Sequence, residues 1–184
     1  MYLTSDLHVG HKKVAWYRGY GDDVDAHDRD IVEHWRATVQ PDDHVWILGD
    51  LAMSSPDRAL EILAELPGHK HLVAGNHDAC HPMHRNAWKH QRRYLTVFDS
   101  VQSAARRKVG DREVLFSHFP YRGDHTAEDR HVQWRLPDQG AWLIHGHTHS
   151  EERRQYPRCI HVGWDAWRRL VSWQEIQRII EETG

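Results

Sequence analysis

Residues 45–50 read Val45-Trp46-Ile47-Leu48-Gly49-Asp50, a short apolar run that ends in a glycine and a carboxylate. Four consecutive apolar residues suit a strand that is buried on both faces. The same pattern, an apolar run followed directly by a polar motif, recurs along the chain. The other runs are Tyr2-Leu3-Thr4, Leu72-Val73-Ala74, Val114-Leu115-Phe116 and Trp142-Leu143-Ile144. The sequence therefore predicts buried strands whose carboxyl ends carry polar side chains.

Apolar residues recur at helical spacing between the first three runs, in residues 31–39 and again in residues 60–66. Ser55-Pro56 marks the start of the second helical segment, and Pro67-Gly68 marks its end. Strands that alternate with helices favour a parallel sheet with crossover connections. We therefore expect parallel strands in the first half of the chain.

The second half has a different pattern. Residues 101–109 and 112–117 flank Gly110-Asp111, which indicates a β-hairpin. Residues 159–162 predict a further strand, and Ser172 is placed to cap a closing helix with apolar residues on one face. Together these patterns predict one domain over residues 1–184, with an α/β sandwich architecture.

The composition is that of a soluble globular protein, with 39% hydrophobic and 28% charged residues. The formal net charge of -3, with the 18 histidines counted as neutral, lacks the basic footprint of a dedicated nucleic-acid binder. We therefore expect no stable nucleic-acid complex. Cys80 and Cys159 are isolated and predict neither a disulfide framework nor a thiolate zinc site. No secretory leader or membrane-spanning run is visible, so we expect a cytoplasmic location without a membrane partner.

Five polar motifs, each at the end of a predicted strand, contain residues that bind metals. They are Asp6-Leu7-His8, Gly49-Asp50, Gly75-Asn76-His77-Asp78, Ser117-His118 and Gly146-His147-Thr148-His149. Each motif alone is weak, because an Asp after a strand is often a helix cap. Five together at the carboxyl ends of strands favour one site. Carboxylate and amide oxygens mixed with imidazoles suit manganese, iron or zinc.

In this order the motifs resemble the signature of the calcineurin-like metallophosphoesterases. Residues 5–11 and 42–50 are similar to the small single-domain members found in bacteria and phages. The resemblance implies a four-layer fold, in which two sheets are flanked by helices, and two divalent transition-metal ions, with manganese first and iron or zinc as alternatives. It implies that Asp50 bridges the two ions. It also implies that Asp6, His8 and His149 bind one ion, and that Asn76, His118 and His147 bind the other.

The same resemblance implies the chemistry, in which the paired ions activate a shared water to attack a phosphate ester. His77 takes the family position that contacts the phosphate and protonates or stabilises the leaving oxygen, and Asp78 orients the His77 imidazole. We therefore predict a phosphodiesterase that acts on small esters such as nucleotides or cyclic nucleotides. A phosphomonoesterase, a nucleotide pyrophosphatase, a nuclease and a non-catalytic scaffold are the alternatives.

Candidates for substrate contacts are His11, in the opening motif, and Tyr121 and Arg122, which closely follow His118. A capping role for His11 and a simple turn at residues 119–122 are equally compatible with the sequence. Four aromatic residues could stack on a nucleobase, although a core position is at least as common for such residues. They are Trp16, Tyr17, Trp134 and Trp142, of which Trp142 is expected in the core.

Other features have simpler interpretations. His161 stands where the family usually has Asn, so its role is left open. Pairs of basic residues could follow a nucleic-acid backbone, but charge runs are usually solvated. These pairs are at positions 92–93, 106–108, 153–154 and 168–169. Nine further histidines are predicted at the surface, namely His27, His34, His44, His69, His71, His84, His90, His125 and His131.

Overall fold

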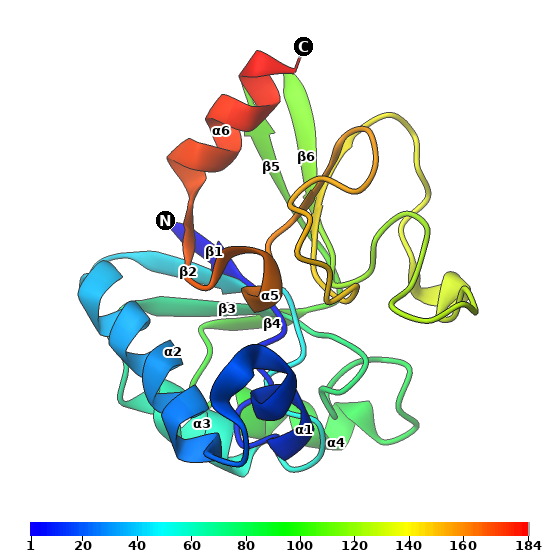
Figure 1. Ribbon diagram of the computed structural model, residues 1–184. Coiled ribbons are helices and arrows are strands. Elements are labelled where there is room, and N and C mark those ends of the chain that lie inside the picture. The colour runs from blue at the N-terminus through cyan, green and yellow to red at the C-terminus, as the bar shows by residue number, and fades with distance from the viewer. Residues whose placement is uncertain (184) are drawn as a thin grey trace.

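The computed structural model describes residues 1–183, which form two β-sheets flanked by helices (Figure 1). The first sheet has the strand order β4-β3-β2-β1-β9. Its strands are β1 (Tyr2–Thr4), β2 (His44–Ile47), β3 (His69–Val73), β4 (Ser100–Gln102) and β9 (Val171–Ser172). Strands β1 to β4 run parallel, as predicted, and β9 joins β1 in the antiparallel sense.

The second sheet has the order β5-β6-β7-β8. Its strands are β5 (Ala105–Val109), β6 (Arg112–Phe116), β7 (Trp142–His145) and β8 (Cys159–His161). Strands β5 and β6 form the predicted antiparallel hairpin around Gly110-Asp111, whereas β6, β7 and β8 are parallel. The hairpin begins at Ala105 rather than at Val101, because residues 100–102 pair with β3 in the first sheet.

Helices cover the first sheet on its outer side, below that sheet in Figure 1. They are α1 (Lys12–Ala15), α2 (Val24–Thr38), α3 (Asp57–Ala64) and α4 (Ala87–Tyr94), with a π-helical segment η1 (Trp16–Tyr20) after α1. Helices α2 and α3 are the two predicted ones. Their apolar faces bury Ile31, Trp35 and Leu63 in one core with Leu72 of β3. This burial of apolar area, at about 25 cal/mol per Å², is what holds helices against the sheet.

A second core lies between the sheets and includes Leu3, Leu48, Phe116 and Ile144. The closing helix α6 (Trp173–Glu182) adds Ile176 to it and is capped as expected. The Ser172 hydroxyl accepts from the Glu175 N–H at 3.2 Å, and the Glu175 carboxylate accepts from the Ser172 N–H at 3.2 Å. The remaining short elements are η2 (Val132–Trp134) and α5 (Trp164–Trp167). The predicted two-sheet α/β fold is confirmed.

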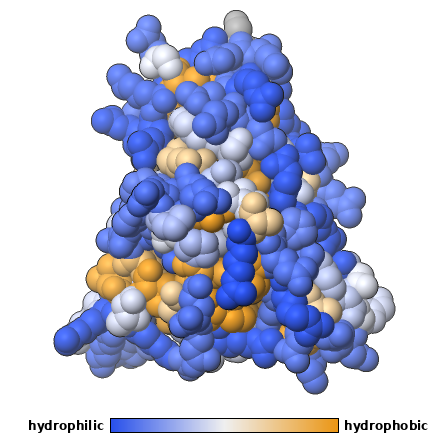
Figure 2. Space-filling view, turned by 90° about the vertical axis from the view of Figure 1, so that its left-hand side faces the viewer, coloured by the Kyte–Doolittle hydropathy of each residue, from blue (hydrophilic) through white to orange (hydrophobic). Residues whose placement is uncertain are grey.

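One face of the surface is shown in Figure 2, where hydrophilic side chains predominate. The apolar residues that show through gather in its lower part, at the height of α2 and α3 in Figure 1. Between these two helices a shallow hollow is lined by Val32, Ile62 and Leu66 with charged neighbours. In residues 1–183 no helix has both the length and the apolar character needed to cross a membrane.

The carboxyl ends of the strands from both sheets meet at one place. The Asp6 N–H, after β1, donates to the Gly49 carbonyl at 3.0 Å, after β2. The Gly146 N–H, after β7, donates to the His118 carbonyl at 3.0 Å, after β6. The His147 N–H then donates to the Asp6 carboxylate at 3.0 Å, which joins the two sheets. The polar motifs predicted at separate strand ends therefore lie together.

Candidate metal centre

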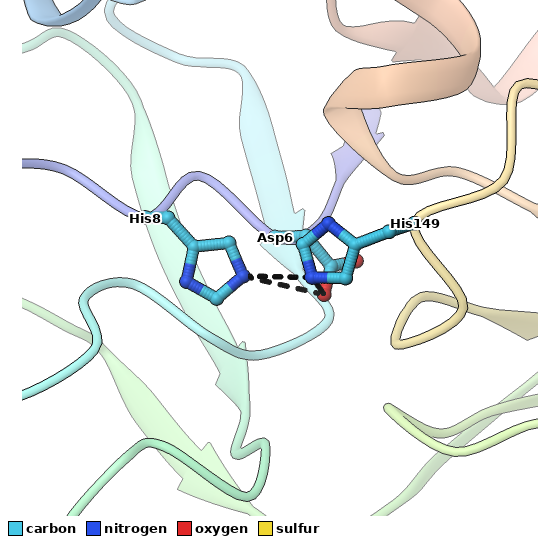
Figure 3. A group of neighbouring side chains, drawn as sticks. All are labelled: Asp6, His8 and His149. Atoms are coloured by element: carbon cyan, nitrogen blue, oxygen red, sulfur yellow. Dashed lines mark hydrogen bonds and ion pairs between the residues drawn. The ribbon is translucent and has the colours of Figure 1, made fainter. Parts of the chain in front are cut away.

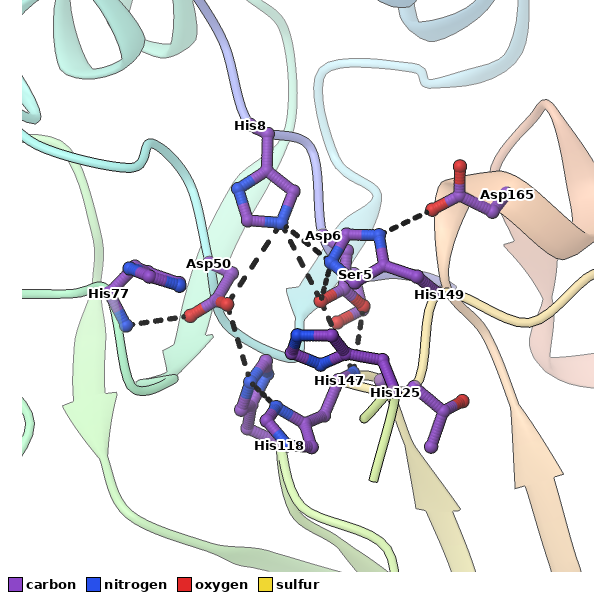
Figure 4. Close-up of polar contacts among 12 residues, drawn as sticks. Ser5, Asp6, His8, Asp50, His77, His118, His125, His147, His149 and Asp165 are labelled. Atoms are coloured by element: carbon purple, nitrogen blue, oxygen red, sulfur yellow. Dashed lines mark hydrogen bonds and ion pairs between the residues drawn. The ribbon is translucent and has the colours of Figure 1, made fainter. Parts of the chain in front are cut away.

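The seven predicted ligands are brought together at this edge, as the close-up in Figure 4 shows for six of them. Five of the seven have a left-handed backbone, with φ between 49° and 70°. They are Asp6, His8, Asp50, His147 and His149. For residues other than glycine this conformation costs on the order of 1 kcal/mol each. Such backbone strain persists where the surrounding structure enforces it, which is typical of functional sites.

The first cluster consists of Asp6, His8 and His149 (Figure 3). The Nε2 atoms of His8 and His149 are 3.1 Å apart. Both lie near the Asp6 Oδ1 atom, at 4.0 Å and 3.9 Å respectively. Two imidazole nitrogens and one carboxylate oxygen that point at the same small volume are a donor set that one divalent transition metal satisfies.

The second cluster is built around His118, whose side chain is fully buried. Its Nε2 atom lies 3.0 Å from the Asn76 Oδ1 atom, 3.2 Å from the His147 Nδ1 atom and 3.5 Å from the Asp50 Oδ2 atom. The same Asp50 oxygen is 4.0 Å from the His8 Nε2 atom of the first cluster. Asp50 thus lies between the clusters, in the place that a bridging ligand requires. The ligand roles themselves stay predictions.

The electrostatics of the site favour bound cations. Burial and then the charges of Asp78 and Asp6 raise the pKa of Asp50 well above its ordinary value, because buried carboxylates repel one another. Burial lowers the pKa of His8 well below the ordinary value, and burial together with His118 lowers that of His147 to about 3. Their imidazoles are therefore neutral at pH 7, which is the form that binds metals. Crowded carboxylates among neutral imidazoles fit divalent ions well.

These shifts predict how the stability of the metal-free protein depends on pH. Burial lowers the pKa of His145 and His147 to about 3 and that of His77 to about 4, from 6.5. Below about pH 6.5 these histidines bind protons in the unfolded chain but not in the folded one. The free energy of unfolding therefore falls, by about 1.4 kcal/mol for each unit by which the pKa of one histidine is lowered. The contribution of these neutral, buried histidines to stability is complete above pH 6.5 and is lost as the pH falls. Asp50, Asp78 and His149, whose pKa values are raised, act in the opposite sense.

Because the histidines with a lowered pKa outnumber these three groups, we expect the unfolding temperature in a chelating buffer to be lower at about pH 5 than at about pH 7. Thermal unfolding followed by circular dichroism across this range measures the effect. A protein that is more stable at about pH 5 would show that the raised carboxyl pKa values dominate.

Two residues that the sequence did not single out hold His149 in position. The Asp165 Oδ2 atom lies 2.9 Å from the His149 Nδ1 atom. Arg18 is buried and donates from Nε and Nη2 to the Asp165 carboxylate, at 2.8 Å each. Burial opposes the charged form, but the hydrogen bond to Asp165 raises the pKa of His149 above its ordinary value. Asp165 follows a predicted strand as the ligand motifs do, which is the signal that could have found it.

We expect Asp165→Asn to weaken metal binding by about 10- to 100-fold, since partners that orient a histidine ligand typically contribute this much. The amide keeps the shape but removes the charge that the Arg18 guanidinium faces. Titration of the apoprotein with Mn²⁺, followed calorimetrically, measures the affinity. Asp138→Asn is the matched control, because Asp138 makes an exposed ion pair with Arg158 at 3.1 Å. Equal affinities in the two variants would remove Asp165 from the positioning of His149.

His147 has a similar neighbour. Its Nε2 atom is 3.2 Å from the Asp124 Oδ2 atom, and Arg130 Nη2 donates to Asp124 Oδ1 at 2.9 Å. The Asp124 side chain is fully buried, which opposes its charged form, but the hydrogen bond from Arg130 and the neighbouring His147 imidazole lower its pKa. Asp124 lies in the irregular segment after β6, where the sequence carried no periodic signal. His125 lies beside Asp124. It lines a cleft over the two clusters, which is also lined by Asp50, His147 and His149.

The Asp78 carboxylate makes other contacts than the predicted one with His77. It accepts three backbone N–H groups, from Gly75 at 2.8 Å, Asp50 at 2.9 Å and Leu51 at 3.2 Å. It therefore ties together the segments after β2 and β3, and it does not hold the His77 imidazole. His77 donates its backbone N–H to the Asp50 Oδ1 atom at 2.9 Å, and its ring lines the cleft.

The predicted substrate contacts are only partly brought to the site. His11 lines the cleft, and its Nδ1 atom also accepts the Val14 N–H at 3.2 Å, so it caps α1 as well. Tyr121 and Arg122 do not line the cleft. The Tyr121 hydroxyl donates to the Ala141 carbonyl at 3.2 Å, and the Arg122 guanidinium lies 5.0 Å from the centre of the Tyr156 ring. Of the four aromatic candidates, Tyr17 lines the cleft and Trp142 is buried, as expected.

Among the nine histidines predicted at the surface, His27 is an error. It is fully buried, with Nε2 3.0 Å from Arg18 Nη1 and Nδ1 2.9 Å from Asp28 Oδ1. Helical spacing alone gave no indication that the Arg18 side chain would reach it. His161, whose role was open, is fully buried beside His145, and neither of its ring nitrogens has a hydrogen-bond partner in residues 1–183.

Two sheets that place acidic and imidazole side chains at their shared edge define a protein with a candidate dinuclear metal centre. The chain matches the calcineurin-like phosphoesterase superfamily domain over residues 2–163, and it belongs to this family. The resemblance found in the sequence is thereby confirmed. Divalent metals are typical of the superfamily, and the Asp and His clusters are groups that can hold them. The protein is therefore classed as a metallophosphoesterase.

Similar proteins occur in mycobacteriophages. The chain is 49% identical to the Gene 66 protein of Mycobacterium phage L5, over 100% of this chain and 97% of that protein. It is 46% identical to the Gene 66 protein of Mycobacterium phage D29, over 99% and 96% respectively. A solved structure, that of the protein of unknown function AQ665 from Aquifex aeolicus, is similar with a TM-score of 0.71 at 24% identity. This likeness covers 97% of this chain and 98% of that one and shows the fold.

Proposed function

We propose that the protein is a phosphodiesterase that hydrolyses small phosphodiesters at two divalent ions, with manganese as the first candidate. The observation that supports a diester is the space around the site. The cleft described above is a hollow of about 580 Å³ that lies over Asp50, His147 and His149. A second hollow of about 510 Å³ lies over Asn76 and continues past it. His77 and Met53 line both hollows, so the two are neighbours beside the clusters.

A phosphodiester has two organic substituents on one phosphorus, and both need room when the phosphate sits at the metal centre. The paired hollows supply this room on two sides, whereas a monoester would use only one. Metal ions bound by the two clusters would supply an activated water and offset the phosphate charge. The chain's own groups do the rest. Asp124 and Asp165 fix the imidazoles of His147 and His149, and His77 lines both hollows.

The proposal is tested by comparing bis(p-nitrophenyl) phosphate and p-nitrophenyl phosphate as substrates of the manganese-loaded protein. We expect a higher kcat/KM for the diester, with no activity in an Asp50→Ala control. Preference for the monoester would reject the diesterase in favour of a phosphomonoesterase. Failure to retain metal and to hydrolyse any activated ester would instead indicate a non-catalytic scaffold.

A nuclease acting along a nucleic-acid backbone receives little support from the basic pairs. Arg106 is paired with Glu113 at 3.0 Å and Arg169 with Glu175 at 2.7 Å, so part of their charge is already neutralised. Steeply salt-dependent binding and cutting of DNA would reverse this judgement, because release of counterions makes such binding sensitive to salt.

A further inference from the structure

The hollow over His149 has an aromatic rim that metal binding does not require. Tyr17 lines this hollow, and 68% of its surface is exposed. The neighbouring Trp16 is 61% exposed, and the two rings meet edge to face with their centres 5.4 Å apart. Leaving such apolar area in water is unfavourable by about 25 cal/mol per Å². Two adjacent exposed aromatic rings beside a cleft are typical of a site that a ligand covers.

Cations stand on the same rim. Lys13 and Arg168 line the hollow together with Tyr17. The Lys13 Nζ atom lies 5.7 Å from the centre of the Tyr17 ring, and Arg168 Nη1 donates to the Arg18 carbonyl at 3.4 Å. Within residues 1–183 neither side chain is paired with a carboxylate. Of the other carboxylates that line the hollow, Glu151 is exposed, whereas Asp165 is paired with Arg18 and His149. The rim therefore combines an aromatic face with cations that are free to meet an anion.

We propose that this hollow is a nucleoside subsite, in which the nucleobase stacks on Tyr17 while Lys13 and Arg168 attract phosphate oxygens. The inference rests on the proposed function, because it identifies one substituent of the phosphodiester. The same hollow of about 580 Å³ has Asp50 and His149 on its floor. A phosphate at the metal centre therefore leaves its nucleoside in reach of Tyr17.

The polarity of the walls favours a nucleoside over a lipid. An acyl chain needs continuous apolar walls, but Tyr17, Val14 and Met53 are interrupted here by histidines and by Thr148. A nucleobase suits this mixture, because its faces stack on an aromatic ring while its edges form hydrogen bonds. The residues of α1 and η1 would thus set the substrate class, whereas the residues after the strands would carry the chemistry.

The test uses the manganese-loaded protein and two esters with the same leaving group. These are the p-nitrophenyl ester of thymidine 5′-monophosphate and methyl p-nitrophenyl phosphate. We expect kcat/KM to be about 5- to 100-fold higher for the nucleoside ester, as for the stacking of one base. Tyr17→Ala should reduce this preference about tenfold, through KM, and Tyr17→Phe should restore it because the ring is kept. Equilibrium binding of thymidine 5′-monophosphate should weaken in parallel.

Trp88→Ala is the matched control, since Trp88 is 72% exposed with the Lys89 Nζ atom 5.3 Å from its ring centre, yet lies on α4 away from this hollow. The Trp88→Ala protein should prefer the nucleoside ester as strongly as the unaltered protein does. Equal rates on the two esters, or a preference that survives in Tyr17→Ala, would overturn the nucleoside subsite and leave the phosphodiesterase standing. If no ester is hydrolysed, the proposed function fails. Binding of thymidine 5′-monophosphate that is equal in the Tyr17→Ala and unaltered proteins would then overturn the subsite as well.

Discussion

Asp50→Asn is expected to lower kcat/KM on bis(p-nitrophenyl) phosphate by about 10³-fold or more, which corresponds to about 4 kcal/mol of transition-state stabilisation. Asp50 Oδ2 is within 4.0 Å of ring nitrogens in both clusters, at His118 and His8. Asparagine keeps the acceptor that the His77 N–H uses but removes the charge between the two clusters. We also expect the metal content after desalting to fall from two ions per chain towards one, measured by plasma mass spectrometry.

The stability of the same variant separates this role from a structural one. Burial and the charges of Asp78 and Asp6 raise the pKa of Asp50, so its carboxylate opposes folding of the metal-free protein. The metal-free Asp50→Asn protein should therefore unfold at the same or a higher temperature than the unaltered protein, although its activity is lost. Sites built for function often give up stability in this way.

The control for Asp50→Asn is Asp42→Asn. Asp42 carries an exposed carboxylate in the turn before β2, the strand that Asp50 follows. It should keep both ions and full activity. If Asp50→Asn retained two ions and normal turnover, Asp50 would not be the shared ligand. A large fall in the unfolding temperature of the metal-free variant would indicate that the carboxylate supports the fold instead.

Most of the fold could be predicted because its strands and long helices carry strong local patterns. Helix α4, in contrast, was not predicted. It presents mostly polar residues and is anchored by two buried ones, Ala87 and Tyr94. Residues 101 and 102 were assigned to the hairpin, since no glycine or proline separates them from Ala105. Which sheet they join depends on pairing with β3, which a local pattern does not contain.

The site shows the same division between local and tertiary information. The candidate ligands lie in motifs that follow apolar runs, so the strands fix where they lie, and the family resemblance supplied their roles. Arg18 and Asp165 are 147 positions apart and meet only in the folded chain. Asp78 was assigned to His77 because the two are adjacent in sequence, yet its carboxylate turns to the backbone of Gly75, Asp50 and Leu51. Sequence adjacency does not make two side chains face each other.

His77→Ala is expected to reduce turnover of diesters with poor leaving groups by about 10²- to 10³-fold, the range for loss of one hydrogen-bond donor to a developing negative charge. The turnover of p-nitrophenyl esters should fall much less, because p-nitrophenolate leaves without assistance. The metal content should not change, because the His77 ring lies outside both clusters, with its centre 5.9 Å from that of His8. His69→Ala, an exposed histidine paired with Asp99, is the control and should behave as the unaltered protein.

The way in which His77 acts follows from its surroundings. Burial, and then the neighbouring His118, lower the pKa of His77 to about 4, so its imidazole is neutral at pH 7 in the free protein. We therefore expect it to stabilise the leaving oxygen through a neutral N–H donor rather than as an imidazolium acid. His77→Gln, which keeps an N–H donor, should then recover part of the activity, and the rate should not decline between about pH 5 and pH 8 as an imidazolium would titrate. A rate that falls steadily across this range, with no recovery in His77→Gln, would require the charged acid, because only that form is lost as the pH rises.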